Sequence, residues 1–198
     1  MIDYLIDTIW GNWVSGGIVM IPLFALAAYI FVIAFEMLKY LKSKKIDTAQ
    51  EDLWLEWVNN PDSAEGSAGE VIRYTRPWQG SADSVRRRFF EVRESTLADV
   101  ERKSKFLGSL VATAPLMGLL GTVQGMLITF QGIASSGGNQ TVDMVSKGIS
   151  TALITTQTGL MIALPGLFLA LVVRRRTRAI QDALNRMEGL IIGSRIEE

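Results

Sequence analysis

Hydroxyl and amide side chains are concentrated in one stretch of the chain, directly after Gly148. The ten residues that follow this glycine include six of them: Ser150, Thr151, Thr155, Thr156, Gln157 and Thr158. Their oxygens accept hydrogen bonds and are the ligand type that hard cations prefer. None of these groups exchanges a proton in a useful pH range. The cluster therefore predicts hydrogen bonding or contact with a cation, rather than proton transfer by its own groups.

The spacing of these residues places them on two neighbouring stripes of a helix, because residues three and four positions apart share a face. Thr151, Thr155 and Thr158 form the first stripe. The second stripe consists of small residues: Ala152, Thr156, Gly159, Ala163, Gly166 and Ala170. Small faces let membrane helices approach closely, since packing drives helix association in lipid. The second stripe therefore predicts a contact with another helix.

A second apolar segment, Phe106–Phe130, offers a facing surface of the same kind. Four of its residues are spaced seven apart: Gly108, Pro115, Thr122 and Thr129. Glycines follow three positions after the last three of these: Gly118, Gly125 and Gly132. If the two segments form an antiparallel hairpin, Thr122 and Thr156 both lie roughly 10–12 Å below its outer boundary.

These patterns give two sets of candidate residues. We expect an ion path lined by Thr122 and Thr156, to which Thr151, Thr155 and Thr158 also contribute oxygens. We expect close helix packing at four small residues: Gly118, Gly125, Gly159 and Ala163. The alternative for the threonines is that each hydroxyl bonds back to a carbonyl of its own helix, as threonines in membrane helices often do.

The residue types exclude several kinds of chemistry. The chain has no cysteine and no histidine, which rules out disulfides, thiol-bound metals and Cys- or His-based catalysis. It shows no glycine-rich phosphate loop, paired-carboxylate motif or metal-ligand spacing, so we expect no cofactor, no metal and no enzymatic activity. The apolar segments contain no ionisable group either, although proton pathways ordinarily use one. Either another chain supplies a carboxylate, or this protein conducts nothing.

Three apolar segments must position the threonines: Gly16–Phe35, Phe106–Phe130 and Ile149–Val173. Each is long enough to cross a bilayer, which takes about 20 residues, and none contains a charged residue. The fold class expected is therefore an all-α membrane protein with three transmembrane helices.

The basic residues set the expected orientation. Of the twenty Lys and Arg residues, all except Lys147 lie between Lys39 and Lys105 or after Val173. By the positive-inside rule, residues 36–105 and 174–198 are cytoplasmic, and residues 1–15 and the loop 131–148 are periplasmic. The arginine triplets at 86–88 and 174–176 fit contact with anionic lipid headgroups. The net charge of zero gives no indication of nucleic-acid binding.

The segments outside the membrane are expected to be largely helical. Residues 1–15 are amphipathic and predict a helix in the outer interface, although they could also extend the first span. The cytoplasmic region 36–105 reads as a helix that stops near Pro61, a Gly/Ser/Ala-rich loop over 61–70, and a helix that continues from about Ser81 to Phe130. The tail 174–198 prolongs the third span, so two of the transmembrane helices extend into a cytoplasmic helical stalk.

Two motifs carry a family resemblance. "ATAPLMGLLGTVQGM", followed by a short glycine-rich loop and "GISTALITTQTGLMIALP", resembles the ExbB/TolQ/MotA family of bacterial inner-membrane motor stators over roughly Leu107–Arg178. The compact size and single cytoplasmic segment are more similar to ExbB or TolQ than to MotA, and ExbB is the first choice.

The resemblance implies a specific assembly. Such subunits form a homo-oligomer, a pentamer with a central pore, around single-span ExbD-like partners that each carry one membrane aspartate. Proton flow through that aspartate drives rotation, and a TonB-like protein transmits the work to transporters of the outer membrane. The pore-facing threonines of the family fall on Thr122 and Thr156 of this sequence.

One departure from the family keeps alternatives open. ExbB and TolQ proteins often carry a glutamate at the position of Thr151. A cluster of neutral oxygens at Thr151, Thr155 and Thr158 would suit Na⁺ better than H⁺. The alternatives are therefore a TolQ-like subunit for envelope maintenance, a Na⁺-coupled variant, or a membrane scaffold that does not conduct.

Overall fold

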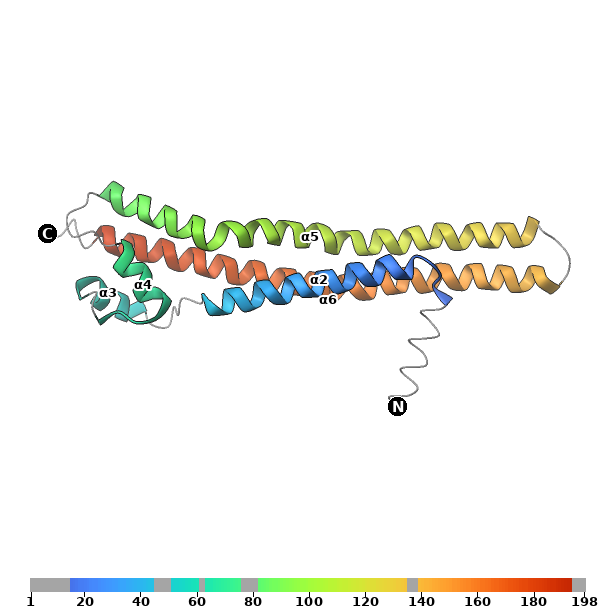
Figure 1. Cartoon of the computed structure of the whole chain (residues 1–198), viewed down its shortest axis with the longest axis horizontal. Coiled ribbons are helices and arrows are strands. Elements are labelled where there is room, and N and C mark those ends of the chain that lie inside the picture. The colour runs from blue at the N-terminus through green and yellow to red at the C-terminus, as the bar shows by residue number, and fades with distance from the viewer. Residues whose placement is uncertain (1–14, 45–50, 61–62, 76–81, 135–138, 194–198) are drawn as a thin grey trace, which may run out of the picture. The chain divides into compact units, whose positions relative to one another are not determined.

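The computed structural model describes residues 15–44, 51–60, 63–75, 82–134 and 139–193 (Figure 1). The regular elements within these ranges are five helices: α2 (Met20–Ser43), α3 (Glu51–Asn59), α4 (Gly66–Thr75), α5 (Ala82–Ala134) and α6 (Asn139–Gly193). The amphipathic helix expected over 1–15 lies, except for its last residue, outside the described residues.

Three of the helices, α2, α5 and α6, are long and apolar enough to cross a membrane. This agrees with the three spans expected from the sequence. α5 and α6 also run without a break far beyond the apolar segments, as predicted. The part of α5 before Phe106 contains no glycine or proline, and the tail of α6 keeps the helical spacing of Ile180, Leu184, Met187 and Ile191 although it contains Gly189.

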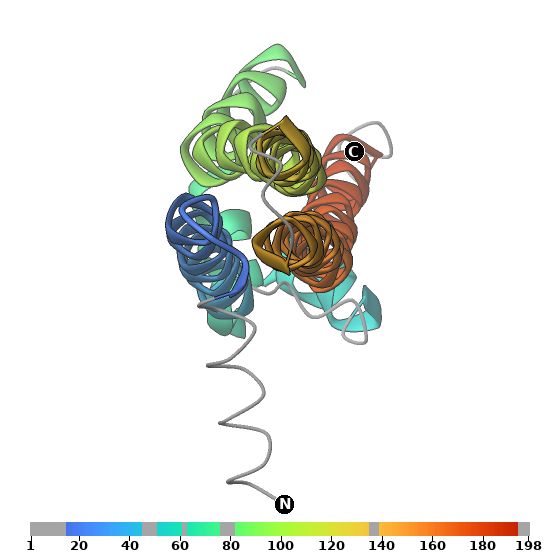
Figure 2. The same ribbon diagram turned by 90° about the vertical axis from the view of Figure 1, so that its right-hand side faces the viewer.

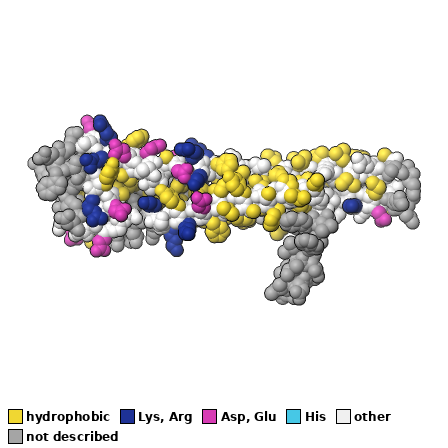
Figure 3. Space-filling view, viewed as in Figure 1, with side chains coloured by type: hydrophobic (Ala, Val, Ile, Leu, Met, Phe, Trp, Pro, Cys, Tyr) yellow, Lys and Arg dark blue, Asp and Glu magenta, His cyan; other side chains and the backbone are white. Residues whose placement is uncertain are grey.

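The chain divides into two compact units. We call residues 1–34 and 106–170 the apolar unit, and residues 35–105 and 171–198 the charged unit. α2, α5 and α6 each contribute to both. In the space-filling view, Lys, Arg, Asp and Glu side chains gather over the charged unit and hydrophobic side chains over the apolar unit (Figure 3).

Close backbone contacts hold α5 and α6 together in the apolar unit. A Cβ atom added to Gly125 would lie 2.5 Å from the carbonyl oxygen of Gly148, and one added to Gly159 would lie 2.7 Å from that of Ala114. Only glycine fits at such separations. The end-on view shows α5 and α6 as adjacent columns with α2 beside them (Figure 2).

α2 joins this pair through a layer of aliphatic side chains. A Cβ added to Gly166 of α6 would lie 3.0 Å from a methyl group of Val111 on α5 and 3.4 Å from one of Ile30 on α2. Nearby, the rings of Tyr29 and Phe106 pack edge to face with their centroids 6.2 Å apart. Because α2 has no charged residue before Glu36, its buried side chains can pack in this way without a desolvation cost.

Polar contacts link the helices of the charged unit. Arg93 of α5 and Glu188 of α6 form an ion pair at 2.5 Å, with 34% and 19% of their side chains exposed. The Tyr40 hydroxyl donates to the carbonyl oxygen of Thr96 at 3.2 Å. The largest fully buried side chains of this unit form its core: Leu41, Trp54, Ile72, Phe89, Leu184, Met187 and Ile191.

The expected loop over 61–70 is wrong in its second half, because α4 begins at Gly66. Gly66 has a φ of +69°, a left-handed conformation that glycine adopts without strain and that turns the chain into the helix. A Cβ on Gly69 would lie 2.6 Å from the backbone of Ala64, so this glycine is required for close packing. The small residues that suggested a loop instead let α4 pack tightly, with Ala68 and Ile72 buried.

Candidate ion-path site

Thr156 lies at one of the close approaches between α5 and α6. Its hydroxyl donates to the carbonyl oxygen of Ala152, 3.1 Å away on its own helix, and lies 3.3 Å from that of Gly118 on α5. A Cβ on Gly118 would be 3.1 Å from the Cα of Thr156. The glycine is therefore what allows the hydroxyl to reach the neighbouring backbone.

Thr122, the other principal candidate, lies four residues beyond Gly118 on α5. Its hydroxyl donates to the carbonyl oxygen of Leu119 at 2.7 Å, and its side chain is half-buried, like that of Thr156. Since four residues rise about 6 Å, Thr122 and Thr156 are about one turn apart along the hairpin. The structure therefore does not place the two residues at the matching depth expected from the sequence.

Two of the other threonines are packed inside the unit. Thr155 is 0% exposed, and its hydroxyl donates to the carbonyl oxygens of Thr151 at 2.9 Å and Ala152 at 3.0 Å. Thr151 is 4% exposed and donates to the carbonyl oxygen of Ser15 at 2.8 Å. At the position where the family resemblance suggested a glutamate, this chain thus has a threonine that is hydrogen-bonded to the segment entering α2.

The last threonine of the cluster, Thr158, is half-buried and donates to the carbonyl oxygen of Ile154 at 2.8 Å. All five candidate hydroxyls therefore donate to a backbone carbonyl. Four of them bond back to their own helix, the arrangement considered as the alternative, whereas Thr151 bonds to the segment before α2. This does not remove their oxygens from chemistry. A hydroxyl whose hydrogen is engaged still offers lone pairs, so it can accept a hydrogen bond or contact a cation.

The four packing candidates occupy different surroundings. Gly118, Gly125 and Gly159 lie at the close approaches between α5 and α6, whereas Ala163 is half-buried. The tightest contact involves a residue that the sequence analysis did not single out: a Cβ on Gly121 would overlap the side chain of Thr155. Its spacing of three from Gly118 and four from Gly125 was the available signal.

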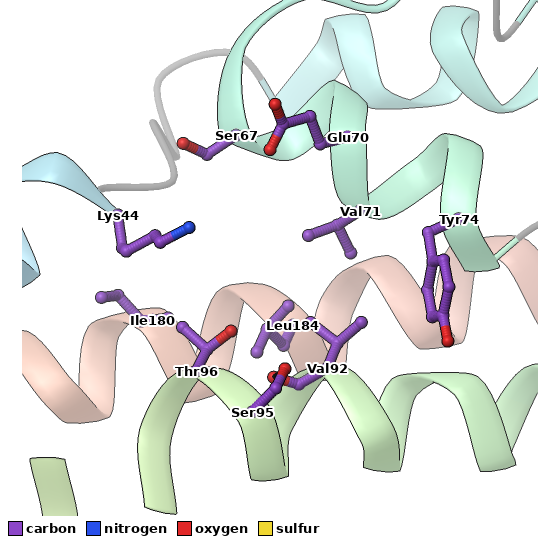
Figure 4. Close-up of a pocket in the computed structure, with 10 residues that line it drawn as sticks. All are labelled: Lys44, Ser67, Glu70, Val71, Tyr74, Val92, Ser95, Thr96, Ile180 and Leu184. Carbon is purple, nitrogen blue, oxygen red and sulfur yellow. Dashed lines mark hydrogen bonds between the residues drawn. The ribbon is translucent and has the colours of Figure 1, made fainter. Parts of the chain in front are cut away.

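The described residues contain no group of three or more acidic, His or Cys side chains that could hold a metal. They do form a cavity of about 280 Å³ in the charged unit, which the sequence analysis did not anticipate (Figure 4). Lys44, Glu70 and Tyr74 lie around it, and Val92 and Leu184 contribute apolar surface. The mixture of charges and aliphatic groups defines no reaction.

Comparison with known proteins identifies the family. Residues 74–186 match the MotA/TolQ/ExbB proton channel family. The chain is 31% identical over 173 residues to the biopolymer transport protein ExbB-like 1 of Synechocystis sp., covering 77% of this chain and 65% of that protein. It is 28% identical over 166 residues to the biopolymer transport protein ExbB homolog of Methanothermobacter thermautotrophicus, covering 76% and 57%.

A TolQ protein is also similar. The Tol-Pal system protein TolQ of Haemophilus influenzae is 36% identical over 87 residues, covering 43% of this chain and 37% of that protein. The chain spans less than two thirds of the length of each of these relatives. The family match includes the whole of the segment that carries Thr122, Thr151, Thr155, Thr156 and Thr158. This chain, a multi-pass membrane protein with three apolar helices, belongs to the MotA/TolQ/ExbB proton channel family.

Proposed function

We propose that this chain is the multi-span subunit of an ion-driven motor in the bacterial inner membrane. In this proposal, copies of the chain form a ring, a pentamer, around a central pore that holds a single-span, ExbD-like partner. The amino terminus is periplasmic and the carboxyl terminus cytoplasmic. Energy from proton flow passes to a TonB-like transmitter that drives transport across the outer membrane.

The observation that carries the proposal is how the threonine hydroxyls use their hydrogens. Thr122 and Thr156 donate to carbonyls of their own helices, so their oxygens face any ligand as acceptors only. An acceptor suits a protonated carboxyl group or a cation, and it repels an ionised carboxylate. Such oxygens would stabilise a membrane aspartate of the partner in its protonated, mobile form.

The chain itself cannot supply the titrating group. Neither Phe106–Phe130 nor Ile149–Val173 contains an Asp, Glu, Lys, Arg or His. Proton pathways through membranes ordinarily use such residues. A partner aspartate therefore completes the pathway, and a scaffold that does not conduct would have no need for hydroxyl groups on the hairpin.

The choice between an ExbB-like and a TolQ-like role favours ExbB. Two ExbB-named relatives align over 77% and 76% of this chain, whereas other ExbB proteins align over 36% and 47% of it and the TolQ relative over 43%. A TolQ-like role in envelope maintenance is the second candidate. Na⁺ coupling is disfavoured by burial, because Thr151 and Thr155 are packed inside the unit and present almost no surface to an ion.

Ion flux in liposomes tests the proposal. The chain is reconstituted alone and with an ExbD-like partner, whose membrane aspartate is either intact or changed to asparagine. The proposal expects proton flux only with the intact aspartate. Flux from the chain alone would contradict the need for a partner carboxylate. Absence of flux in every mixture, with complex formation verified, would favour the scaffold.

The coupled ion is tested in the same vesicles. Replacing Na⁺ by choline should leave the flux unchanged if protons are carried. A flux that stops in choline and returns with Na⁺ would establish the Na⁺-coupled variant instead.

A further inference from the structure

The outward face of α6 in the apolar unit carries a regular row of uncovered side chains. Six residues spaced alternately by four and three are all exposed, and we call them the α6 outer seam: Ser146, Ser150, Leu153, Gln157, Leu160 and Leu164. A spacing of four and three repeats every seven residues, which is the pattern of helices that pack side by side over their length.

α5 carries a second row of the same kind. Six exposed residues spaced alternately by three and four make up the α5 outer seam: Thr113, Leu116, Leu120, Val123, Leu127 and Phe130. Both seams face away from the glycine contacts that join α5 to α6 within the chain, since those glycines are buried.

The two seams lie at the same height along the hairpin. Gly118 lies beside Thr156, Gly125 beside Ala152 and Gly132 beside Met144. With this pairing, the α6 outer seam begins at the height of Phe130, where the α5 outer seam ends. It ends near the height of Thr113, where the α5 outer seam begins. Copies related by an axis along the membrane normal keep every residue at its own height. The α6 outer seam of one copy therefore matches the α5 outer seam of the next.

Gln157 indicates that a protein, and not lipid, covers the α6 outer seam. Its side chain is exposed and has no partner among the described residues. Its neighbours along the seam, Leu153, Leu160 and Leu164, are apolar, so the surface around the amide is not that of a water-filled path. An amide left unpaired in hydrocarbon is costly, whereas Gln side chains readily hydrogen-bond across membrane helices.

Thr122 is the best-placed partner for that amide on a neighbouring α5. Gln157 lies at the height of Gly118, and Thr122 lies one turn further along α5. Helical side chains lean toward the amino terminus of their helix. On α6 this lean carries the Gln157 side chain toward the height of Thr122. Thr122 is half-buried next to Val123 of the α5 outer seam, and its oxygen still accepts because its hydrogen is donated to Leu119.

We propose that the α6 outer seam packs against the α5 outer seam of a second copy of this chain, with the Gln157 amide donating to Thr122 and fixing the register between copies. This rests on the homo-oligomer of the proposed function and adds the contact surface and the positioning residue. A head-to-tail contact of two different surfaces generates a closed ring when its rotation closes.

Disulfide cross-linking tests the proposal directly, because the chain contains no cysteine. Leu153 and Val123 lie at matching height on the two seams. In oxidised membranes, the double variant Leu153→Cys/Val123→Cys should give a ladder of covalent oligomers. Each single variant should stay monomeric. Cross-linked dimers from Leu153→Cys alone would show that α6 meets α6 and would overturn the proposal, as would the absence of any ladder.

The role of the Gln157 amide is tested by comparing the cross-link yields of two cysteine pairs that correspond to two registers of the interface. A second pair, Leu160→Cys with Val123→Cys, is displaced by seven residues. Changing Gln157→Leu should lower the yield of the matched pair relative to the displaced pair by about threefold, the effect of one typical hydrogen bond between membrane helices. Thr122→Val should lower this ratio by the same factor. The double variant Gln157→Leu/Thr122→Val should lower it no further, because both changes remove one hydrogen bond. Ser150→Ala on the same seam is the control and should leave the ratio unchanged.

An unchanged ratio in Gln157→Leu would overturn the positioning role. The cross-links do not depend on conduction, so the two proposals fail separately. Specific cross-links without ion flux would reject the motor function and keep the interface. Ion flux without cross-links between the seams would reject the proposed interface and keep the motor function.

Discussion

The hydroxyl of Thr156 lies 3.3 Å from the carbonyl oxygen of Gly118, on the facing helix. This places a polar side chain against a backbone group at a point where a Cβ on the glycine would come within 3.0 Å of the Thr155 carbonyl oxygen. The contact joins the two kinds of residue that the sequence singles out, a threonine and a glycine. The proposed ion path and the close packing of the hairpin therefore depend on the same backbone geometry.

Replacing Thr156 by valine separates these two roles. Valine has a similar shape but lacks the hydroxyl, so assembly should be spared. Ion flux with the partner should fall about fivefold, since one hydrogen bond contributes about 1 kcal/mol. Flux in liposomes and the oligomer peak in detergent are the two measurements. Thr156→Ser keeps the hydroxyl and serves as the control. Normal flux in the valine variant would argue strongly against an ion-path role.

Adding a single methyl group at Gly125 should destabilise the hairpin. A Cβ there would lie 2.5 Å from the Gly148 carbonyl oxygen and 2.7 Å from the Ala152 nitrogen, and neither backbone atom can move aside alone. Gly125→Ala should therefore lower the free energy of unfolding by about 1–3 kcal/mol, as overpacking does. Gly125→Leu should also abolish the oligomer peak in detergent.

Gly189 provides the matched control for this change. It lies within α6, and nothing approaches within 4 Å of a Cβ added there. Gly189→Ala should stabilise the protein by up to about 1 kcal/mol through helix propensity alone. Equal effects at the two glycines, measured by unfolding in detergent, would show that the close approach at Gly125 is not rigid.

The comparison of sequence with structure shows what helical periodicity can and cannot determine. Uninterrupted apolar segments predict the three spans, the absence of glycine and proline before Phe106 predicts the extension of α5, and the helical spacing of apolar residues in the tail predicts the extension of α6. Periodicity also predicts which face of each helix carries the small residues. It does not determine the axial register of two helices, because a slide of about one turn keeps the same faces in contact. For that reason Thr122 and Thr156, expected at one depth, lie a turn apart.

α4 illustrates a second limit. Glycine and serine in the 61–70 segment suggest a loop, since both residues favour turns. In the structure, Gly69 is needed because α4 turns back closely against Ala64. A single sequence does not distinguish a glycine that is present for flexibility from one that is present for lack of a side chain.

The ion pair between Arg93 and Glu188 should contribute measurably to the stability of the charged unit. It joins α5 to α6 at 2.5 Å and is only partly exposed, with 34% and 19% of the two side chains accessible. Glu188→Ala should lower the free energy of unfolding by about 1–2 kcal/mol, less than a fully buried charged bond because solvent screens part of it.

Asp83 and Arg86 form the control pair for this prediction. Their 3.5 Å contact is within one helix, and 62% of the Arg86 side chain and 85% of the Asp83 side chain are exposed. Asp83→Ala should change stability by less than about 0.5 kcal/mol. A loss at Glu188 no larger than the loss at Asp83 would mean that the interhelical ion pair contributes nothing beyond an ordinary surface contact.

The contact between Tyr74 and Glu91 makes a prediction about pH. The Tyr74 hydroxyl donates to Glu91 at 2.8 Å, and this hydrogen bond, together with the negative charge of Glu91, raises the pKa of Tyr74 above its ordinary value of about 10. Since the protonated phenol is the stabilised form, the link between α4 and α5 is complete below pH 10 and is lost as pH rises through the higher folded value. The difference between the ultraviolet titrations of the wild type and Tyr74→Phe isolates this group. Glu91→Gln should move its midpoint downward, and a midpoint that stays in place would show that the carboxylate does not hold the phenol.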